Sequence, residues 1–431
     1  MTRGRKIYRM LRVKLLGHFR TFESLAIGDF RLIWLGQLSV SMGQWMDQVT
    51  RGWLIYGLTH SPLQLGLMSA CRGTPLLAFG AISGAVADRY GRKAQLIIAQ
   101  VVNAILNIIL ATLVLTGRVH PWHVYVTGFL TGTVQAFEQP ARQVLINDVV
   151  GSNLLLNAIA LNSAALNLSR SVGPALSGVL IQAVGVDMSY YLQAALFVMA
   201  TVWTIQIKVP RSSREAMKRT RRESTQSLLG STSEGFAYIV SNRLILSLMV
   251  LGLAPIVIGM PFISLMPIFA IDVFHGGART QGLLLTMLGV GAVLGALGIA
   301  SIGNRQTNGK ILLAAAAGFG LCLVLFSRSP GVLYAAFFTF LAGVFNSSYT
   351  SQNQTIIQLI TPAALRGRVL GIYLLNRGLM PVGGLLAGVL AHFFGGPSAV
   401  TVMGTSCFLL VMGVAFLAPS VRQIGATPEV L

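Results

Sequence analysis

Two acidic residues lie inside long apolar segments, and each has an arginine four residues later. Asp47 is followed by Arg51, and Glu138 is followed by Arg142. Residues four apart share one face of an α-helix, so each acid can form an ion pair with its arginine. A buried carboxyl that exchanges its arginine partner between two conformations can take up and release a proton. We therefore predict that Asp47 and Glu138 carry protons; for Asp47 and its arginine partner, a structural ion pair that fixes helix register is the alternative.

Further polar side chains lie within the apolar segments. Arg72 follows the turn at His60 by about the distance at which Asp47 precedes it, so we expect both at a similar depth. Arg170 and Arg377 each precede a proline by four residues, where they bind either a substrate anion or carbonyls that the proline frees. The candidate cavity or substrate residues are Gln44, Arg51, Arg72, Arg142, Arg170 and Arg377.

The composition identifies the environment of these charges. Hydrophobic residues make up 54% of the 431 residues and charged residues 10%, whereas soluble domains carry roughly 25% charged residues. The basic residues cluster in short segments between apolar runs, which excludes a folded nucleic-acid-binding face. Three cysteines and six histidines show no spacing for a metal, and no phosphate-binding loop is present. We predict an integral protein of the lipid bilayer, with no cofactor, no metal, no nucleic-acid partner and no enzymatic activity.

Twelve apolar segments are long enough to cross a bilayer. The predicted spans are 30–58, 62–85, 94–116, 122–146, 153–183, 187–208, 238–271, 279–302, 310–327, 331–357, 367–392 and 397–419. A basic segment divides them into two groups of six. The expected regions are a basic N-terminal segment 1–29, a bundle 30–209, a central loop 210–237, a bundle 238–420 and a tail 421–431.

The distribution of basic residues predicts the orientation. Lys and Arg concentrate before span one, after spans two, eight and ten, and in the central loop, while the opposite loops hold Arg118, Arg279 and Arg328. Basic loops stay in the cytoplasm, so we expect both termini and the central loop there.

The two halves also repeat. Residues 168–174 match residues 375–381, with the arginine and proline at identical spacing. Repeated six-helix halves are typical of transporters, whose substrate sites lie near the midplane between the repeats.

Two motifs carry a resemblance to a known family. Residues 84–93 (Gly-Ala-Val-Ala-Asp-Arg-Tyr-Gly-Arg-Lys) resemble the loop 2–3 signature of the major facilitator superfamily. Residues 173–178 (Gly-Pro-Ala-Leu-Ser-Gly) resemble the antiporter motif of the family's exporters, with Ser177 in place of a glycine. Segments 29–31, 53–56 and 140–143 are similar to the bacterial branch that includes enterobactin exporters and macrolide efflux pumps.

The resemblance implies an all-α fold of two pseudo-symmetric six-helix bundles that work by alternating access. It implies proton-coupled export of a small amphiphilic molecule, such as a drug or siderophore, across the bacterial inner membrane. We expect a monomer whose partners are a small-molecule substrate and protons. A proton-coupled importer or facilitator of a metabolite, or a non-transporting sensor on the same fold, is the alternative.

The resemblance also implies roles for motif residues. A conformational latch in loop 2–3 comprises Gly84, Asp88, Arg89, Gly91 and Arg92. The antiporter-like motif comprises Gly173, Pro174 and Gly178. A purely topological anchor at the membrane surface is the alternative for the loop, and a simple packing kink for the motif.

Overall fold

A computed structural model describes residues 20–89, 91–151, 154–208, 228–302, 308–363 and 365–424. For residues 20, 21, 81, 82, 84–89, 228–233, 302 and 374–377 it describes the backbone and not the side chain. Most of the predicted basic segment 1–29, most of the central loop and most of the tail 421–431 therefore lie outside the described residues.

The first half of the chain forms one bundle of long helices. A short 3₁₀ segment, η1 (Arg20–Ala26), precedes it. The six spans are α2 (Gly28–Thr59), α3 (Pro62–Arg89), α4 (Arg92–Leu115), α5 (Pro121–Val150), α6 (Leu155–Val184) and α7 (Val186–Gln206). Each corresponds to a predicted span, because long apolar segments satisfy their backbone groups within a helix.

The second half begins with a helix that the sequence analysis placed partly in the central loop. Helix α9 (Leu228–Ser241) ends where the side chain of Asn242 accepts hydrogen bonds from the backbone N–H groups of Leu244 and Ile245, both at 3.1 Å. This cap starts a new helix, so the seventh span begins at Arg243 rather than at residue 238.

The seventh span is interrupted rather than continuous. It consists of α10 (Arg243–Leu253), η2 (Ala254–Gly259), η3 (Met260–Leu265), α11 (Met266–Ile268) and η4 (Phe269–Val273). Prolines 255, 261 and 267 recur along it, and each removes a backbone donor from the helix. The carbonyl of Leu251, four residues before Pro255, instead accepts a hydrogen bond of 2.6 Å from the Tyr349 hydroxyl.

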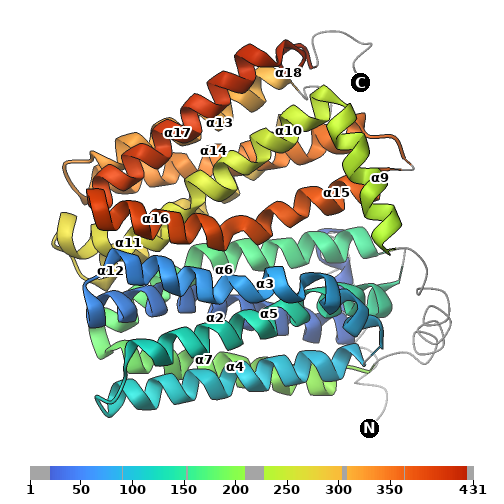
Figure 1. Ribbon diagram of the computed structural model, residues 1–431. Coiled ribbons are helices and arrows are strands. Elements are labelled where there is room, and N and C mark those ends of the chain that lie inside the picture. Colours follow the sequence, from blue (N-terminus) through green and yellow to red (C-terminus); the bar gives the residue numbers. More distant parts are fainter. Residues whose placement is uncertain are drawn as a thin grey trace.

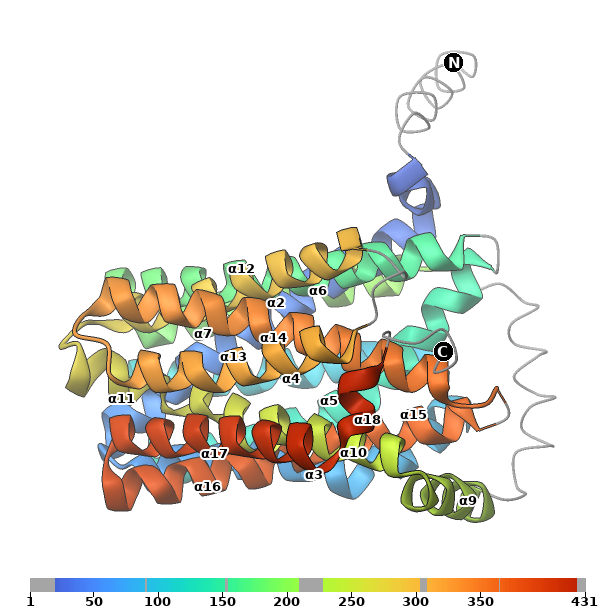
Figure 2. The same cartoon turned by 90° about the horizontal axis from the view of Figure 1, so that it is seen from above.

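The remaining spans complete the second bundle. They are α12 (Ala278–Ile302), α13 (Gly309–Ser327), α14 (Val332–Ile360), α15 (Arg366–Leu375) with η6 (Asn376–Leu379) and α16 (Met380–Phe394), and α17 (Gly396–Leu417), followed by α18 (Pro419–Gln423). The described chain thus contains the twelve predicted spans in two groups of six. Figures 1 and 2 both place α9 and α18 at the end opposite α11, which we call the α9 end.

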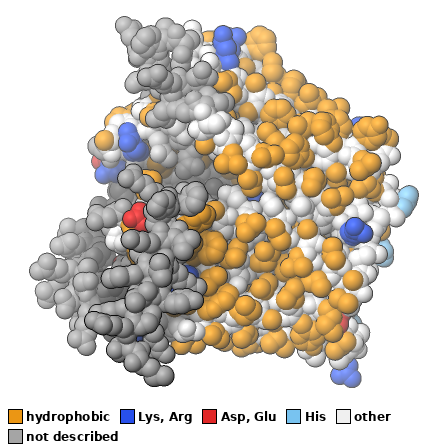
Figure 3. Space-filling model, turned by 180° about the vertical axis from the view of Figure 1, so that it is seen from behind, with side chains coloured by type: hydrophobic (Ala, Val, Ile, Leu, Met, Phe, Trp, Pro, Cys, Tyr) orange, Lys and Arg blue, Asp and Glu red, His pale blue; other side chains and the backbone are white. Residues whose placement is uncertain are grey.

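The spans differ in how apolar they are. Among the described residues, seven helical runs are long and apolar enough to cross a membrane by hydropathy alone, including the whole seventh span. Helices α2, α3, α5 and α6 have the length but carry polar and charged side chains. Hydrophobic side chains are spread over the described part of the face shown in Figure 3, as expected of a surface in contact with lipid.

The two bundles meet along two helix pairs, α6 with α12 and α3 with α16 (Figure 1). Glycines allow the close approach. A Cβ atom on Gly66 would lie 2.9 Å from the Cα of Gly388, and one on Gly178 would lie 3.0 Å from the Cα of Gly282. These contacts are near the loops at the opposite end from α9, which we call the His60 end. The bundles are therefore packed together at the His60 end.

Candidate functional site

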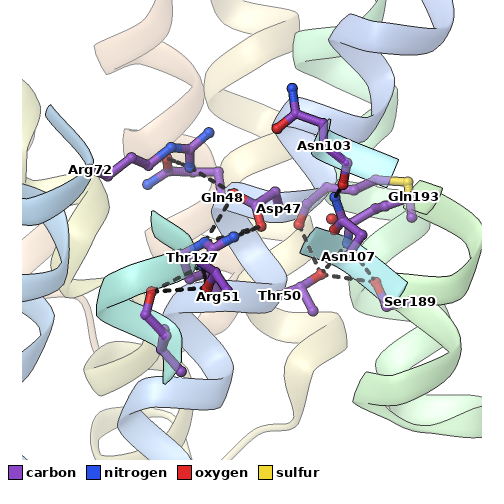
Figure 4. Close-up of polar contacts among 12 residues, drawn as sticks. Asp47, Gln48, Thr50, Arg51, Arg72, Asn103, Asn107, Thr127, Ser189 and Gln193 are labelled. Atoms are coloured by element: carbon purple, nitrogen blue, oxygen red, sulfur yellow. Dashed lines mark hydrogen bonds and ion pairs between the residues drawn. The ribbon is translucent and has the colours of Figure 1, made fainter. Parts of the chain in front are cut away.

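An ion-pair cluster of three charges lies in the interior of the first bundle (Figure 4). The Asp47 carboxylate contacts Nη2 of Arg51 at 2.9 Å and Nη1 of Arg72 at 3.1 Å. Asp47 and Arg51 lie on α2, and Arg72 comes from α3. Asp47 and Arg72, which the sequence predicted at a similar depth, are thus in contact, and Arg51 contacts the same carboxylate. The carboxylate is shared between two guanidinium groups.

Each of the three guanidinium nitrogens of Arg51 contacts an acceptor within the bundle. Its Nε atom lies 3.1 Å and 3.2 Å from the two carboxylate oxygens of Asp47. Its Nη1 atom donates to the backbone carbonyl of Val124 at 3.1 Å and to Oγ1 of Thr127 at 2.8 Å, both on α5. The residue is 1% exposed. Every nitrogen of this guanidinium has an acceptor, so Arg51 ties α2 to α5.

Arg72 is less completely paired. Its Nη1 atom also donates to Oε1 of Gln48 at 3.2 Å, but Nε and Nη2 have no acceptor among the described residues. Its side chain is 15% exposed. Two guanidinium groups share one carboxylate, so the cluster carries one uncompensated positive charge.

A second ion pair lies on α5. The Oε1 atom of Glu138 accepts a hydrogen bond from Nη2 of Arg142, one helical turn later. Glu138 is 2% exposed, and its Oε2 atom has no hydrogen-bond partner among the described residues. Glu138 therefore differs from Asp47, whose two oxygens both contact arginine.

The other candidate cavity residues occupy varied surroundings. Gln135 on α5 points its Nε2 atom at Oε1 of Gln44 from 3.5 Å, the long limit for a hydrogen bond. The guanidinium carbon of Arg170 lies 5.5 Å from the centre of the Trp45 ring, within reach of a cation–π contact. The side chain of Arg377 lies outside the described residues.

The structure describes part of the predicted latch. Arg92 at the start of α4 forms an ion pair with Asp148 near the end of α5. Gly91 is the N-cap of α4 with φ −61°, and a Cβ atom there would meet nothing within 4 Å, so this conformation requires no glycine. The side chains of Asp88 and Arg89, and the surroundings of Gly84, lie outside the described residues.

The antiporter-like motif packs α6 between two neighbours. A Cβ atom on Gly173 would lie 2.8 Å from Cβ of Trp45 on α2, and one on Gly178 would lie 2.7 Å from the Ala278 carbonyl on α12. Pro174 lies between them within α6. The motif thus occupies the interface between the two bundles.

A group of buried amides and hydroxyls that was not predicted from the sequence lies next to the ion-pair cluster, on the side away from Arg72 (Figure 4). Thr50 Oγ1 lies 2.8 Å from the hydroxyls of Ser177 and Ser189 and accepts from Nε2 of Gln193 at 3.0 Å. Gln100, Asn103 and Asn107 lie on α4, which packs against α7. Their spacing by three and four residues in an otherwise apolar segment is the signal that would have identified them.

Two hydrogen-bonding contacts between the bundles were also not predicted from the sequence. The Tyr56 hydroxyl on α2 donates to the Asp272 carboxylate on η4, and the hydroxyls of Ser69 on α3 and Ser264 on η3 lie 3.2 Å apart. Asp148, the ion-pair partner of Arg92, was not predicted either. These partners are far apart in the sequence, so no spacing rule identifies them.

Comparison with known proteins identifies the family. The model of transmembrane secretion effectors, a branch of the major facilitator superfamily, matches residues 20–429. The chain belongs to this family. The match covers both bundles and confirms the predicted superfamily and the twelve-helix fold. The protein is thus a multi-pass membrane transporter by family.

Curated relatives include exporters. A staphyloferrin A transporter of Staphylococcus aureus is 24% identical over 87% of this chain and 93% of its own length. The multidrug efflux pump Tap of Mycolicibacterium fortuitum is 26% identical over 92% of this chain and 97% of its own. An enterobactin exporter of Citrobacter koseri is 25% identical over 98% and 97%.

Solved structures support the fold. The nucleoside transporter NupG superposes with a TM-score of 0.70 at 15% identity, covering 90% of this chain and 98% of that one. A POT family transporter in complex with a thioalcohol-conjugated peptide gives a TM-score of 0.69 at 11% identity, covering 91% and 96%. At these identities the likeness concerns the fold alone.

Proposed function

We propose that this protein is a proton-coupled antiporter that exports a small amphiphilic molecule, such as a drug or a siderophore, from a bacterial cell. Relatives named as an enterobactin exporter and a multidrug efflux pump support export over uptake. The inner membrane is the proposed location, with both termini and the α9 end in the cytoplasm, in agreement with the excess of basic residues there. The His60 end then faces outward.

Glu138 is the observation that carries proton coupling. It is a buried carboxylate with one arginine partner and one oxygen without a partner among the described residues. A proton can bind this oxygen without first displacing a guanidinium group. Asp47 would have to give up contacts to two arginines, so of the two predicted proton carriers Glu138 is the one we favour.

The proton's effect on the ion pair suggests how it drives the conformational change. Protonation of Glu138 neutralises the carboxylate and leaves the Arg142 charge buried without its counter-ion, which destabilises that arrangement. Loss of the proton to the cytoplasm restores the pair. Antiport further requires that substrate and proton bind alternately rather than together, while the two bundles open alternately at either end.

Deletion and vesicle transport test this proposal. A strain lacking the protein is compared with its parent for retained and secreted small molecules and for drug susceptibility. The compound that accumulates is then offered to everted vesicles, where we expect uptake that requires an acidic interior. A reversed gradient dependence would indicate an importer, and the absence of any flux would overturn the transport proposal.

Matched variants test the proton carrier. Glu138→Gln removes the charge but keeps the shape, and it should abolish gradient-driven uptake at normal protein level. Glu234→Gln is the control, because Glu234 also pairs with an arginine, Arg368, but is exposed at the surface. Asp47→Asn measures the contribution of the second acid. Proton-driven uptake that persists in both Glu138→Gln and Asp47→Asn contradicts the assignment.

A further inference from the structure

The ion-pair cluster around Asp47 has an unused binding edge. We propose that Arg72 forms the binding site for an anionic group of the exported molecule, a carboxylate or a similarly planar oxyanion. The inference rests on the proposed export function and names the chemical class of its cargo. It also distinguishes the two arginines that share Asp47, because every nitrogen of the Arg51 guanidinium already contacts an acceptor, whereas two nitrogens of Arg72 contact none among the described residues.

The donors of Arg72 have the geometry that such an anion requires. Nη1 is taken by Asp47 and Gln48 at 3.1 Å and 3.2 Å. The remaining donors, Nε and Nη2, lie along one edge of the planar guanidinium group. Two parallel N–H groups on one edge bind a carboxylate in a bidentate manner. Arg51 binds Asp47 through the same edge, Nε and Nη2, so the cluster already contains one example of the proposed contact.

The charge of the cluster favours an anion over other ligands. Arg51 and Arg72 together carry two positive charges against the single negative charge of Asp47. An uncompensated charge within a membrane span is unfavourable, unless a ligand or water offsets it. A bound carboxylate makes the cluster neutral, whereas a bound cation makes it more unfavourable. The site therefore selects against cationic groups at Arg72.

Neutral polar side chains next to Arg72 can bind the rest of the substrate. Gln48 turns its oxygen toward Arg72, which leaves its amide N–H groups as donors. Gln44 lies one turn earlier on α2, and within the described part of the chain its side chain has only the long 3.5 Å contact to Gln135. Gln44, Gln48, Arg72 and Gln135 are all half-buried, in contrast to the fully buried Arg51. The polar surroundings thus come from α2, α3 and α5.

Close packing with α5 sets the position of Arg72. A Cβ atom on Gly132 would lie 1.9 Å from the backbone carbonyl of Arg72, and one on Gly128 would lie 4.0 Å from its Cβ. The backbone of α3 can approach α5 at this level because residue 132 is a glycine. The α3 backbone therefore holds the guanidinium group near Asp47 through a contact that allows no larger side chain.

Binding to the purified full-length protein in detergent tests the site. The probes are 1-naphthoate and 1-naphthamide, which share a ring system and differ in charge. We expect 1-naphthoate to raise the melting temperature of the wild type, and 1-naphthamide to have little effect. Arg72→Gln should weaken 1-naphthoate binding by at least tenfold, and Arg72→Lys by less. Arg328→Gln, at an exposed arginine of the His60 end, should bind as the wild type does.

Three outcomes would overturn the inference. They are no effect of 1-naphthoate on the wild type, equal effects of both probes, and undiminished 1-naphthoate binding by folded Arg72→Gln. If Arg72→Gln fails to fold, Gln48→Leu and Arg72→Lys take its place, and unchanged 1-naphthoate binding in both counts against the site. Because binding in detergent requires no gradient, this experiment is independent of proton coupling. Proton-driven export of a purely cationic compound, insensitive to Arg72→Gln, would refute the anion site and leave the antiporter proposal standing.

Discussion

Tyr56 on α2 donates a hydrogen bond to the carboxylate of Asp272 on η4, and this bond connects the two bundles at the His60 end. The nearby hydroxyls of Ser69 and Ser264 connect α3 with η3. Both partners from the second bundle belong to the interrupted seventh span. Opening of this end therefore requires that the seventh span separate from α2 and α3.

A disulfide across this seam should lock the transporter. In a background without Cys71, Cys322 and Cys407, the double variant Ser69→Cys/Ser264→Cys should cross-link on oxidation, because the two hydroxyl oxygens lie 3.2 Å apart. We expect oxidation to stop transport and reduction to restore it. The two single-cysteine variants serve as controls and should be insensitive. Full transport by the cross-linked protein would show that this end need not open.

Removal of the Tyr56 hydroxyl should weaken the closed state of the His60 end. A hydrogen bond to a charged group contributes about 1.5–3 kcal/mol, so Tyr56→Phe should shift the equilibrium toward the open form by roughly tenfold or more. The rate at which the Ser69→Cys/Ser264→Cys variant forms its disulfide reports this shift. This rate should fall when Tyr56→Phe is added. Tyr125→Phe is the matched control, because Tyr125 bonds to Gln64 within the first bundle. Equal rates in Tyr56→Phe and the parent would contradict the role of this bond.

Arg51 should matter more for stability than Arg72 does. Removal of one partner from a buried ion pair costs about 3–5 kcal/mol, and Arg51 also holds Val124 and Thr127 of α5. Arg51→Gln should therefore lower the yield and the melting temperature clearly below those of Arg72→Gln. Arg328→Gln gives the baseline for loss of an exposed arginine. Arg51→Gln as stable as that baseline would refute the assignment of Arg51 as a helix tie.

The buried amide of Asn103 should be replaceable by an apolar side chain. Neither of its amide atoms has a partner among the described residues, and the residue is 1% exposed. Replacement of an unpaired buried polar group by an apolar one of similar size is neutral or stabilising, so Asn103→Leu should keep or raise the melting temperature by the equivalent of about 1 kcal/mol. In Asn107→Leu a hydrogen bond of 2.7 Å to the Asn103 carbonyl is lost, so this variant should be less stable. A large loss in Asn103→Leu would indicate that its amide binds internal water.

The sequence by itself determined the spans and the local ion pairs. Apolar length alone identifies a membrane helix, and the helical repeat places Asp47 beside Arg51 and Glu138 beside Arg142. Counting residues from the turn at His60 also predicted that Arg72 lies at a depth similar to that of Asp47. These features depend on the geometry of single helices or of one hairpin.

Only the tertiary structure decided how these groups are used. Asp47 contacts Nε and Nη2 of Arg51, and Val124 and Thr127 from α5 accept from its Nη1. Asp47 and Gln48 both contact Nη1 of Arg72, so its Nε and Nη2 have no acceptor among the described residues. The bond from Tyr56 to Asp272 and the amide group behind Asp47 likewise depend on how neighbouring helices are rotated about their axes. That rotation is set by many side-chain contacts between segments far apart in the chain. The spacing of residues within one helix does not predict those contacts.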